Sequence, residues 1–334
     1  MTLPAQMSAI VVDTPGGPDA LHLATIPTPA PKPGEVLIRV AAAGINAPDL
    51  AQRRGDYPPP PGASPLLGLE ASGEIVVPAG EWKIGDQVVA LCNGGGYAEY
   101  VAVPAGQVLP APPNWSLTDA AALPECWFTI TQTLVMRAGL APGMTVLIYG
   151  AAGGIGGAAI QINKLLGADP IAVVSSAEKA DYALALGARA AIRHDTEDVV
   201  ARVRELTNDR GAERIVDLIG GATTSRNIDA AARFGHIVLI STLGDRNADL
   251  PLNKIVGRQL TISGSTLRPQ TPETKAAIAD RLRRDLWPAL ADPALPHPQI
   301  RTFPLAEAAA AHRAMEDRAH FGKIVLVMPD HQSR

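Results

Sequence analysis

Residues 148–157 read Ile-Tyr-Gly-Ala-Ala-Gly-Gly-Ile-Gly-Gly and decide the fold of the central part of the chain. An apolar strand-like run precedes this stretch at 145–149, and a helical pattern follows at 155–166. Spaced glycines allow a tight turn and a close approach of the main chain to a pyrophosphate, whose oxygens the amides of the helix start can bind. The context predicts a dinucleotide-binding loop, and the alternative is a cluster of turn and helix-packing glycines. The residues expected to contact the cofactor here are Gly150, Gly153, Gly154, Ile155 and Gly156.

Strands and helices alternate on both sides of this loop. One amphipathic stretch is expected to be a helix capped by Thr196, with Glu197 and Asp198 in its first turn. The strand-like runs show little polar alternation, as expected where helices cover both faces of a parallel sheet. These runs lie at 145–149, 171–175, 214–219, 236–241 and 260–263. The alternation predicts an α/β fold with a doubly wound parallel sheet.

The two ends of the chain read differently from its middle. The first third is β-rich, with strands expected at 8–13, 35–40, 73–77 and 86–91. In the last third, Thr271-Pro272-Glu273 is a helix start, residues 305–321 are expected to form a helix that Gly322 ends, and 323–328 a final strand. We therefore expect a first module at 1–120, a nucleotide-binding module at 121–263, and a return to the first module at 264–334.

The strand at 171–175 ends where the adenosine ribose of a bound dinucleotide is expected. An NAD site would place an acidic residue there, to accept hydrogen bonds from the ribose 2′-hydroxyl. This chain instead has Ser175 and Ser176, with Lys179 three residues on. Hydroxyls and a cation suit a 2′-phosphate, so we expect NADPH. Glu178 is the opposing feature, although an acidic residue is also favourable in the first turn of a helix.

Composition narrows the classes of function. The chain has 334 residues, 29 Lys and Arg against 33 Asp and Glu, and a formal net charge of −4, which argues against nucleic-acid binding. Residues 144–163 are uncharged and as long as a membrane span, but five of them are glycines, so no membrane span is expected. The first six residues lack a signal-peptide pattern, and two cysteines imply no disulfide framework. A cytoplasmic location is therefore expected.

No metal site is expected. Cys92 and Cys126 are the only thiols, so a four-cysteine zinc lobe is impossible, and the seven histidines have no ligand-like spacing. Cys126 is interpreted as a buried apolar residue rather than a ligand or a nucleophile.

Over essentially its whole length the chain resembles the medium-chain dehydrogenase/reductase superfamily, in its zinc-free quinone oxidoreductase branch. Gly44-Ile45-Asn46-Ala47-Pro48-Asp49 resembles a family motif in which zinc enzymes carry a ligand cysteine at the place of Asn46. Gly68-Leu69-Glu70-Ala71-Ser72-Gly73 resembles a second signature, with Leu69 at the place of a ligand histidine. The loop at 150–156 resembles the family's cofactor motif, with Gly150 in place of the usual alanine.

A narrower resemblance is to the tumour-suppressor-inducible quinone oxidoreductases. It rests on residues 52–64, Leu123-Pro124-Glu125, residues 82–86 and 322–326. The resemblance implies a GroES-like, barrel-like catalytic domain, a Rossmann domain, a cofactor in the cleft between them, and a homodimer or tetramer joined through 260–265. It also suggests His194 near the 2′-phosphate, with Arg193 as an alternative, although the usual Asn-Tyr run is missing there.

The resemblance suggests further site residues, each with a structural alternative. Asn46 is expected to donate to the nicotinamide ribose or the acceptor, or else to form a local turn. Tyr57 is expected to stack on a quinone or donate to its oxygen, or else to lie on a surface loop. Thr129 and Phe321 lie in segments that approach the cofactor in the family, although both could serve only packing. None of these is a convincing general acid.

We therefore expect hydride transfer from NADPH to a quinone without a metal, since a hydroquinone anion is stable enough to need none. The second hypothesis is a reductase of 2-alkenals or enoyl substrates, which requires the same hydride and oxyanion site. The third, from a different class, is an NADPH-binding structural protein of low turnover. The expected partners are a small quinone or enone and a second copy of the chain.

Overall fold

The computed structural model describes residues 3–318 and 320–329, and the chain divides into two compact units. The first unit comprises residues 1–128, 268–293 and 299–334, and the second comprises 129–267 and 294–298. Sequence analysis placed the corresponding changes at 120–121 and 263–264.

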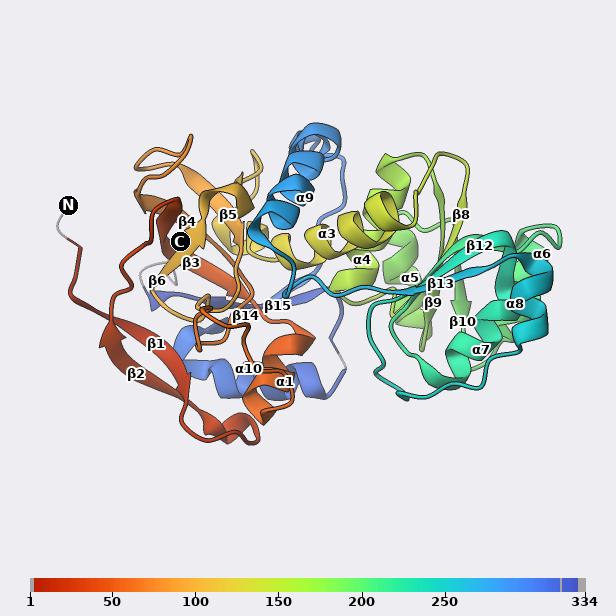
Figure 1. The fold of residues 1–334 in the computed structure, drawn as a ribbon, viewed down its shortest axis with the longest axis horizontal. Coiled ribbons are helices and arrows are strands. Elements are labelled where there is room, and N and C mark those ends of the chain that lie inside the picture. The colour runs from red at the N-terminus through yellow and green to blue at the C-terminus, as the bar shows by residue number, and fades with distance from the viewer. Residues whose placement is uncertain (1–2, 319, 330–334) are drawn as a thin grey trace. The chain divides into compact units, whose positions relative to one another are not determined.

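The first unit is built on strands that pair antiparallel, except that β14 pairs parallel with β15 (Figure 1). A two-stranded sheet pairs β1 (Gln6–Val12) with β2 (Leu21–Pro27). The second sheet has seven strands in the order β14-β15-β3-β4-β5-β7, with β6 paired to β3. Its members are β3 (Glu35–Gly44), β4 (Glu70–Val77), β5 (Gln87–Leu91), β6 (Tyr100–Pro104), β7 (Val108–Pro110), β14 (Ile300–Pro304) and β15 (Lys323–Val327). Apolar side chains such as Val36, Ile38, Ile75 and Val88 fill its core.

Helices and short turns of the first unit surround this sheet. The helices are α1 (Ala47–Arg54), α2 (Leu117–Ala120), α3 (Pro124–Ile130), α9 (Pro272–Asp285) and α10 (Ala308–Glu316); α3 continues into the second unit from Thr129. Short 3-10 segments lie at Pro18–Ala20, Ala105–Gln107, Trp287–Ala291 and Leu305–Glu307. The predicted start of α9 is confirmed, because Thr271 caps it by accepting a hydrogen bond from the Thr274 amide, at 3.3 Å.

The second unit contains the predicted doubly wound sheet, with all its strand pairs parallel and the order β10-β9-β8-β11-β12-β13. Figure 1 shows α4 and α5 on one side of this sheet and α7 and α8 on the other. A π-helical segment, Thr131–Arg137, precedes it. The strands are β8 (Thr145–Tyr149), β9 (Asp169–Val174), β10 (Ala190–Arg193), β11 (Ala212–Asp217), β12 (Ala231–Leu239) and β13 (Thr261–Gly264). The helices are α4 (Gly154–Leu165), α5 (Ala177–Ala185), α6 (Val199–Leu206), α7 (Gly221–Ala230) and α8 (Leu252–Arg258).

Two helix boundaries differ from the sequence-based expectation. Thr196 does not cap α6: Asp198 does, by accepting a hydrogen bond from the Ala201 amide at 2.9 Å, while the Glu197 carboxylate accepts from the Arg193 amide. The expected helix at 305–321 begins with a 3-10 turn and ends as α10 at Glu316, because Arg318 takes a left-handed φ of 52° that interrupts helical geometry.

The uncharged segment 144–163 is divided between β8, the glycine loop and α4. In the described part of the chain, no helix combines the length and the apolar character that crossing a membrane requires. The segment 260–265 lies where the resemblance implied, since β13 is an edge strand of the parallel sheet.

Candidate functional site

The glycine loop has the geometry that a pyrophosphate requires. Gly150 follows β8 with a left-handed φ of 61°, and Gly153 precedes α4 in extended conformation. A Cβ on Gly156 would lie 2.4 Å from the Ala151 Cα and from the Gly150 carbonyl oxygen, so only glycine lets the helix approach the loop this closely. The amides of Gly154 and Ile155 lie in the first turn of α4, where phosphate oxygens are bound in such folds. The loop therefore fits a dinucleotide.

Polar side chains predicted to contact the 2′-phosphate gather at the carboxyl ends of β9 and β10. Ser176 caps α5 by accepting from the Lys179 amide, and the Lys179 Nζ lies 3.3 Å from the Ser175 Oγ. The His194 amide donates to the Val174 carbonyl at 3.1 Å, which places exposed His194 beside the same strand end. Arg193, the alternative to His194, is paired with Asp195 at 2.8 Å.

The acidic residue that opposed NADPH is used locally. Glu178 lies in the first turn of α5, and hydrogen bonding with the Ser176 side chain lowers the pKa of its carboxyl below the ordinary value. Its side chain is exposed. This end of the sheet therefore presents the Ser175 and Ser176 hydroxyls directly after β9, and both Glu178 and Lys179 in the first turn of α5.

A buried acid that sequence analysis missed, Asp217, shapes the carboxyl end of β11. Asp217 accepts hydrogen bonds from the Ile219 and Gly220 amides and from the side chains of Thr224 and Asn227. With four donors on one carboxylate, it fixes the turn from β11 into α7. An aspartate within the apolar run at 214–219 was the available signal.

In the first unit, Asn46 belongs to a buried polar network. Its amide Nδ2 donates to the Glu70 Oε1 at 2.8 Å, and its Oδ1 accepts from the Lys323 Nζ at 2.7 Å. Lys323 and Glu70 form an ion pair at 2.5 Å, with side chains 5% and 0% exposed. Asp49 accepts from the amides of Asn46 and Gly68, and its burial raises the pKa of its carboxyl to about 6. Asn46 therefore orders the start of α1 and pairs with Glu70 and Lys323.

This network does not fit zinc. The Lys323 ammonium already lies against the oxygens of Asn46 and Glu70, the polar atoms that would face a metal. Leu69, at the place of a ligand histidine, is buried and aliphatic. Burial raises the pKa of the Cys126 thiol to about 12, so it stays protonated. Within residues 3–318 and 320–329, no three His, Cys, Asp or Glu side chains are grouped to hold a metal ion.

Tyr57 lies beside Arg268, whose guanidinium carbon is 5.4 Å from the ring centroid. Arg268 donates through Nε and Nη2 to the Asn93 carbonyl, at 3.2 and 2.9 Å, while its buried Nη1 has no hydrogen-bond partner in the described structure. Lys275 is 1% exposed and donates to the Asn93 side chain and, at 2.7 Å, to the Arg268 carbonyl. One buried cation, Arg268, therefore contacts Tyr57, and a second, Lys275, is hydrogen-bonded to the Arg268 carbonyl.

Glu125 connects the Asn46–Glu70–Lys323 network with the group formed by Tyr57, Arg268 and Lys275. Sequence analysis quoted Glu125 only as part of a family match. Its main-chain amide donates to the Glu70 Oε2 at 2.8 Å. Burial and the neighbouring Glu70 raise the pKa of its carboxyl to about 8. Its negative charge also acts to raise the pKa of the Tyr57, Arg268 and Lys275 side chains.

The other predicted residues are less distinctive. Thr129 is buried on α3. Phe321 is half-buried in the connection from α10 to β15. Neither position distinguishes a cofactor contact from packing.

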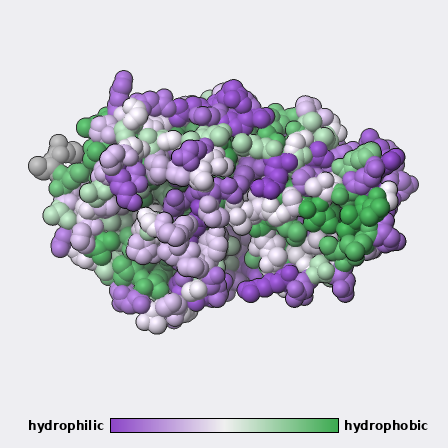
Figure 2. Space-filling view, in the orientation of Figure 1, coloured by the Kyte–Doolittle hydropathy of each residue, from purple (hydrophilic) through white to green (hydrophobic). Residues whose placement is uncertain are grey.

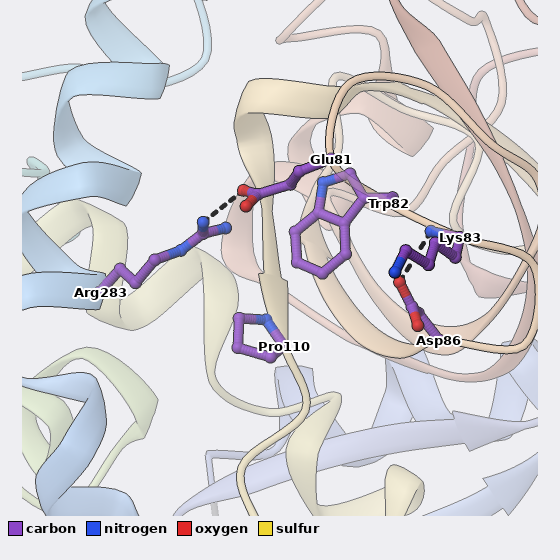
Figure 3. A pocket seen from close by; sticks show the side chains of 6 residues that line it. All are labelled: Glu81, Trp82, Lys83, Asp86, Pro110 and Arg283. Carbon is purple, nitrogen blue, oxygen red and sulfur yellow. Dashed lines mark hydrogen bonds and ion pairs between the residues drawn. The ribbon is translucent and has the colours of Figure 1, made fainter.

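A surface pocket lies elsewhere in the first unit, and Figure 3 shows the side chains that line it. Its volume is about 340 Å³. Trp82 and Pro110 form its walls, and Arg283 pairs with Glu81 across its rim. None of the predicted site residues lines it, so it is separate from the network described above.

Comparison with known proteins identifies the family. Residues 154–282 match the family described as zinc-binding dehydrogenase, and residues 32–113 match the alcohol dehydrogenase GroES-like domain. A quinone oxidoreductase of Pseudomonas aeruginosa is 33% identical over 93% of this chain and 97% of its own. The 2-haloacrylate reductase of a Burkholderia species is 31% identical over 96% of this chain and 98% of its own. This chain belongs to the medium-chain dehydrogenase/reductase family, of quinone oxidoreductase type.

Solved structures agree with this assignment. An NAD-dependent alcohol dehydrogenase superposes with a TM-score of 0.85 at 33% identity, covering 96% of this chain and 99% of that one. The CurK enoyl reductase superposes with a TM-score of 0.84 at 26% identity, covering 98% of this chain and 100% of that one. A mycobacterial protein complexed with NADPH superposes with a TM-score of 0.82 at 28% identity, covering 96% of this chain and 100% of that one. The GroES-like and Rossmann-type units are thus confirmed.

The chain also matches part of much longer proteins. A phenolphthiocerol/phthiocerol polyketide synthase subunit of Mycobacterium tuberculosis is 28% identical over 96% of this chain, which spans only 15% of that subunit.

Proposed function

We propose that the protein is an NADPH-dependent quinone oxidoreductase that works without a metal. The observation that carries the proposal is the Lys323–Glu70–Asn46 network, in which Asn46, at the place of a ligand cysteine in the zinc enzymes that the chain resembles, is hydrogen-bonded to an ammonium group. When bound, NADPH supplies the hydride. A quinone suits such a site because its reduced anion is stabilised by its own aromatic ring and requires no Lewis acid.

The residues divide the work between the two units. Gly150, Gly153, Gly154, Ile155 and Gly156 hold the pyrophosphate, and Ser175, Ser176, Lys179 and His194 bind the 2′-phosphate. Tyr57 presents an aromatic face and a hydroxyl to the acceptor, Asn46 orients its surroundings, and Thr129 and Phe321 contact the cofactor. The bond between Lys179 and Ser175 supports NADPH over NADH, since it places a cation and a hydroxyl together at the end of β9.

Reduction of an activated alkene is the second candidate. The similarity of the chain to a 2-haloacrylate reductase and to an enoyl reductase favours it. Such a substrate takes the hydride on a carbon and then needs a proton on the neighbouring carbon, whereas a quinone takes its proton on oxygen.

We also propose that two copies associate through the β13 edge and that the protein works in the cytoplasm. An edge strand leaves main-chain donors and acceptors available to a second sheet. The neighbouring α8 adds apolar surface, because Leu252 and Val256 are 68% and 76% exposed.

The function is tested by following NADPH oxidation with an ortho-quinone, a para-quinone and a 2-alkenal in parallel, and repeating each with NADH. We expect the fastest turnover with NADPH and a quinone. Turnover with the alkenal alone would establish the second candidate instead, and faster turnover with NADH would contradict the assignment of the 2′-phosphate pocket.

A matched pair of variants tests the cofactor preference. Lys179→Ala removes one charge-assisted hydrogen bond to the phosphate, so the Kd for NADPH should rise roughly tenfold while that for NADH stays constant. Lys32→Ala removes an exposed cation of the other unit and should change neither Kd, both measured by quenching of protein fluorescence.

A further inference from the structure

The mechanism proposed above leaves the source of the proton open, and Glu125 has the surroundings of a proton donor. Glu125 lies at the start of α3 and is 9% exposed. Its main-chain amide is fixed to Glu70, which orients the first turn. No described residue donates a hydrogen bond to the Glu125 carboxyl oxygens, so both are free to face a reacting group.

Two cations near Glu125 can stabilise the carboxylate that remains when it gives up its proton. The third cation, Lys323, is paired with Glu70. Among the described residues, Arg268 and Lys275 form no ion pair, and they donate instead to Asn93 and to the Arg268 carbonyl. They are therefore the cations available to a newly formed carboxylate. The titratable and charged groups that interact electrostatically with Glu125 are Asp49 from α1, Tyr57 from the loop after it, Glu70 from β4, Cys92, Cys126, Arg268, Lys275 from α9 and Lys323 from β15.

Resting on the proposed function, we propose that Glu125 is the general acid that protonates the reduced acceptor beside Tyr57 and Arg268. The acceptor takes two electrons with the hydride and becomes a hydroquinone anion. The O–H bond of the Glu125 carboxyl then breaks, and its proton forms the new O–H bond of the hydroquinone. The carboxylate that remains lies near Lys275 and Arg268, and water restores its proton. The sum is one NADPH, one quinone and one proton converted to NADP⁺ and hydroquinone.

The Arg268 guanidinium has a distinct part in this step. Its buried Nη1 lacks a partner, while its other nitrogens hold Asn93, so one donor remains for the negative oxygen of the acceptor. A cation that stacks on Tyr57 also keeps the aromatic ring in place.

The test is the pH dependence of kcat in the wild type and in Glu125→Gln, with a quinone as acceptor. Because burial raises the pKa of Glu125 to about 8, the acid form predominates below this pH, and wild-type kcat should fall above it. Gln has the shape of the protonated acid but no proton to give. We expect kcat to fall roughly 100-fold and the decline above pH 8 to disappear, with the Kd for NADPH unchanged.

Two further variants separate chemistry from structure. Glu125→Asp keeps an acid at a shorter reach and should recover part of the lost kcat. Glu81→Gln makes the same change at the surface, where Glu81 pairs with Arg283, and should keep the wild-type profile. Wild-type kcat and pH profile in Glu125→Gln would overturn the assignment and leave the quinone reductase activity standing. A wild-type enzyme that reduces no acceptor would overturn both the proposed activity and the role of Glu125. The pH profile of the wild type tests the proposal even if a variant fails to fold.

Discussion

At the scale of single residues, the most demanding feature is a lysine inside the first unit. Lys323 and Glu70 are both removed from water, which costs several kcal/mol per ion unless geometry and hydrogen bonds compensate. Compensation is present, since Asn46 and the Ile45 carbonyl accept from the ammonium and the Glu125 amide donates to the carboxylate. The Lys323–Glu70 ion pair is therefore stable in the interior only while both charges and these hydrogen bonds are present.

This argument predicts the effect of removing one charge. Lys323→Met leaves Glu70 buried and unpaired, so the free energy of unfolding should fall by about 3–5 kcal/mol in urea denaturation. The double variant Glu70→Gln with Lys323→Met should recover most of that loss. Arg39→Met breaks a partly exposed pair with Glu74 and should cost at most about 1 kcal/mol. Equal losses in the two single variants would refute the account.

Residue-level prediction from the sequence succeeded where the signal was local. The glycine loop lies within ten residues, and its geometry follows from steric limits that only glycine meets. Asn46 was chosen, but its partners are 24 and 277 positions away, and nothing in a short window reveals such a network. Glu125 and Arg268 were overlooked as site residues for the same reason, because their chemistry depends on burial.

At the scale of elements, the approach of α4 to the glycine loop is the critical contact. Gly156→Ala would set a Cβ 2.4 Å from main-chain atoms of the loop, which cannot move as a flexible side chain can. We expect a loss of about 1–3 kcal/mol in the free energy of unfolding. The displaced helix start should also raise the Kd for NADPH at least roughly tenfold.

The neighbouring glycine provides the control. A Cβ on Gly157 would meet only the Leu186 Cδ1, at 3.2 Å, and Ala is the better helix former. Gly157→Ala should therefore keep both stability and affinity within about 1 kcal/mol of the wild type. If Gly156→Ala matched it in thermal unfolding and NADPH titration, the close approach would have no role.

Element types were easier to predict than element ends. Buried strands of the parallel sheet have apolar runs that few other structures share. The end of α10 and the cap of α6 were wrong because several neighbouring residues have similar capping and helical tendencies. Asp198 and Thr196 can both cap a helix, and the choice depends on where Glu197 finds its hydrogen bond.

At the scale of the whole molecule, the chain leaves the first unit and returns to it. The pattern predicted a return, but the short stretch 294–298 that belongs to the second unit has no composition of its own that would have revealed it. The Gln161 amide donates to the Pro296 carbonyl, which ties this stretch to α4. Such long-range connections lie beyond what local periodicity can predict.

The proposed dimer gives the prediction at this scale. Figure 2 shows an apolar area on the face of the second unit where Figure 1 places α7 and α8. Leu252 and Val256 lie one helical turn apart on α8, which packs on β12, the partner of edge strand β13. Two charges there should oppose association, since burying them unpaired is costly. Leu252→Glu with Val256→Glu should sediment as a monomer where the wild type sediments as a dimer.

The control for this prediction is a charge placed on another exposed apolar residue of the same unit. Leu184 on α5 is 44% exposed, away from the β13 edge in the strand order, and Leu184→Glu should leave the dimer intact. A wild type that sediments as a monomer at micromolar concentration would contradict the dimer itself. A doubly charged variant that still dimerises would instead remove α8 from the interface and leave the main-chain groups of β13 as the contact, because only they could then join the two sheets.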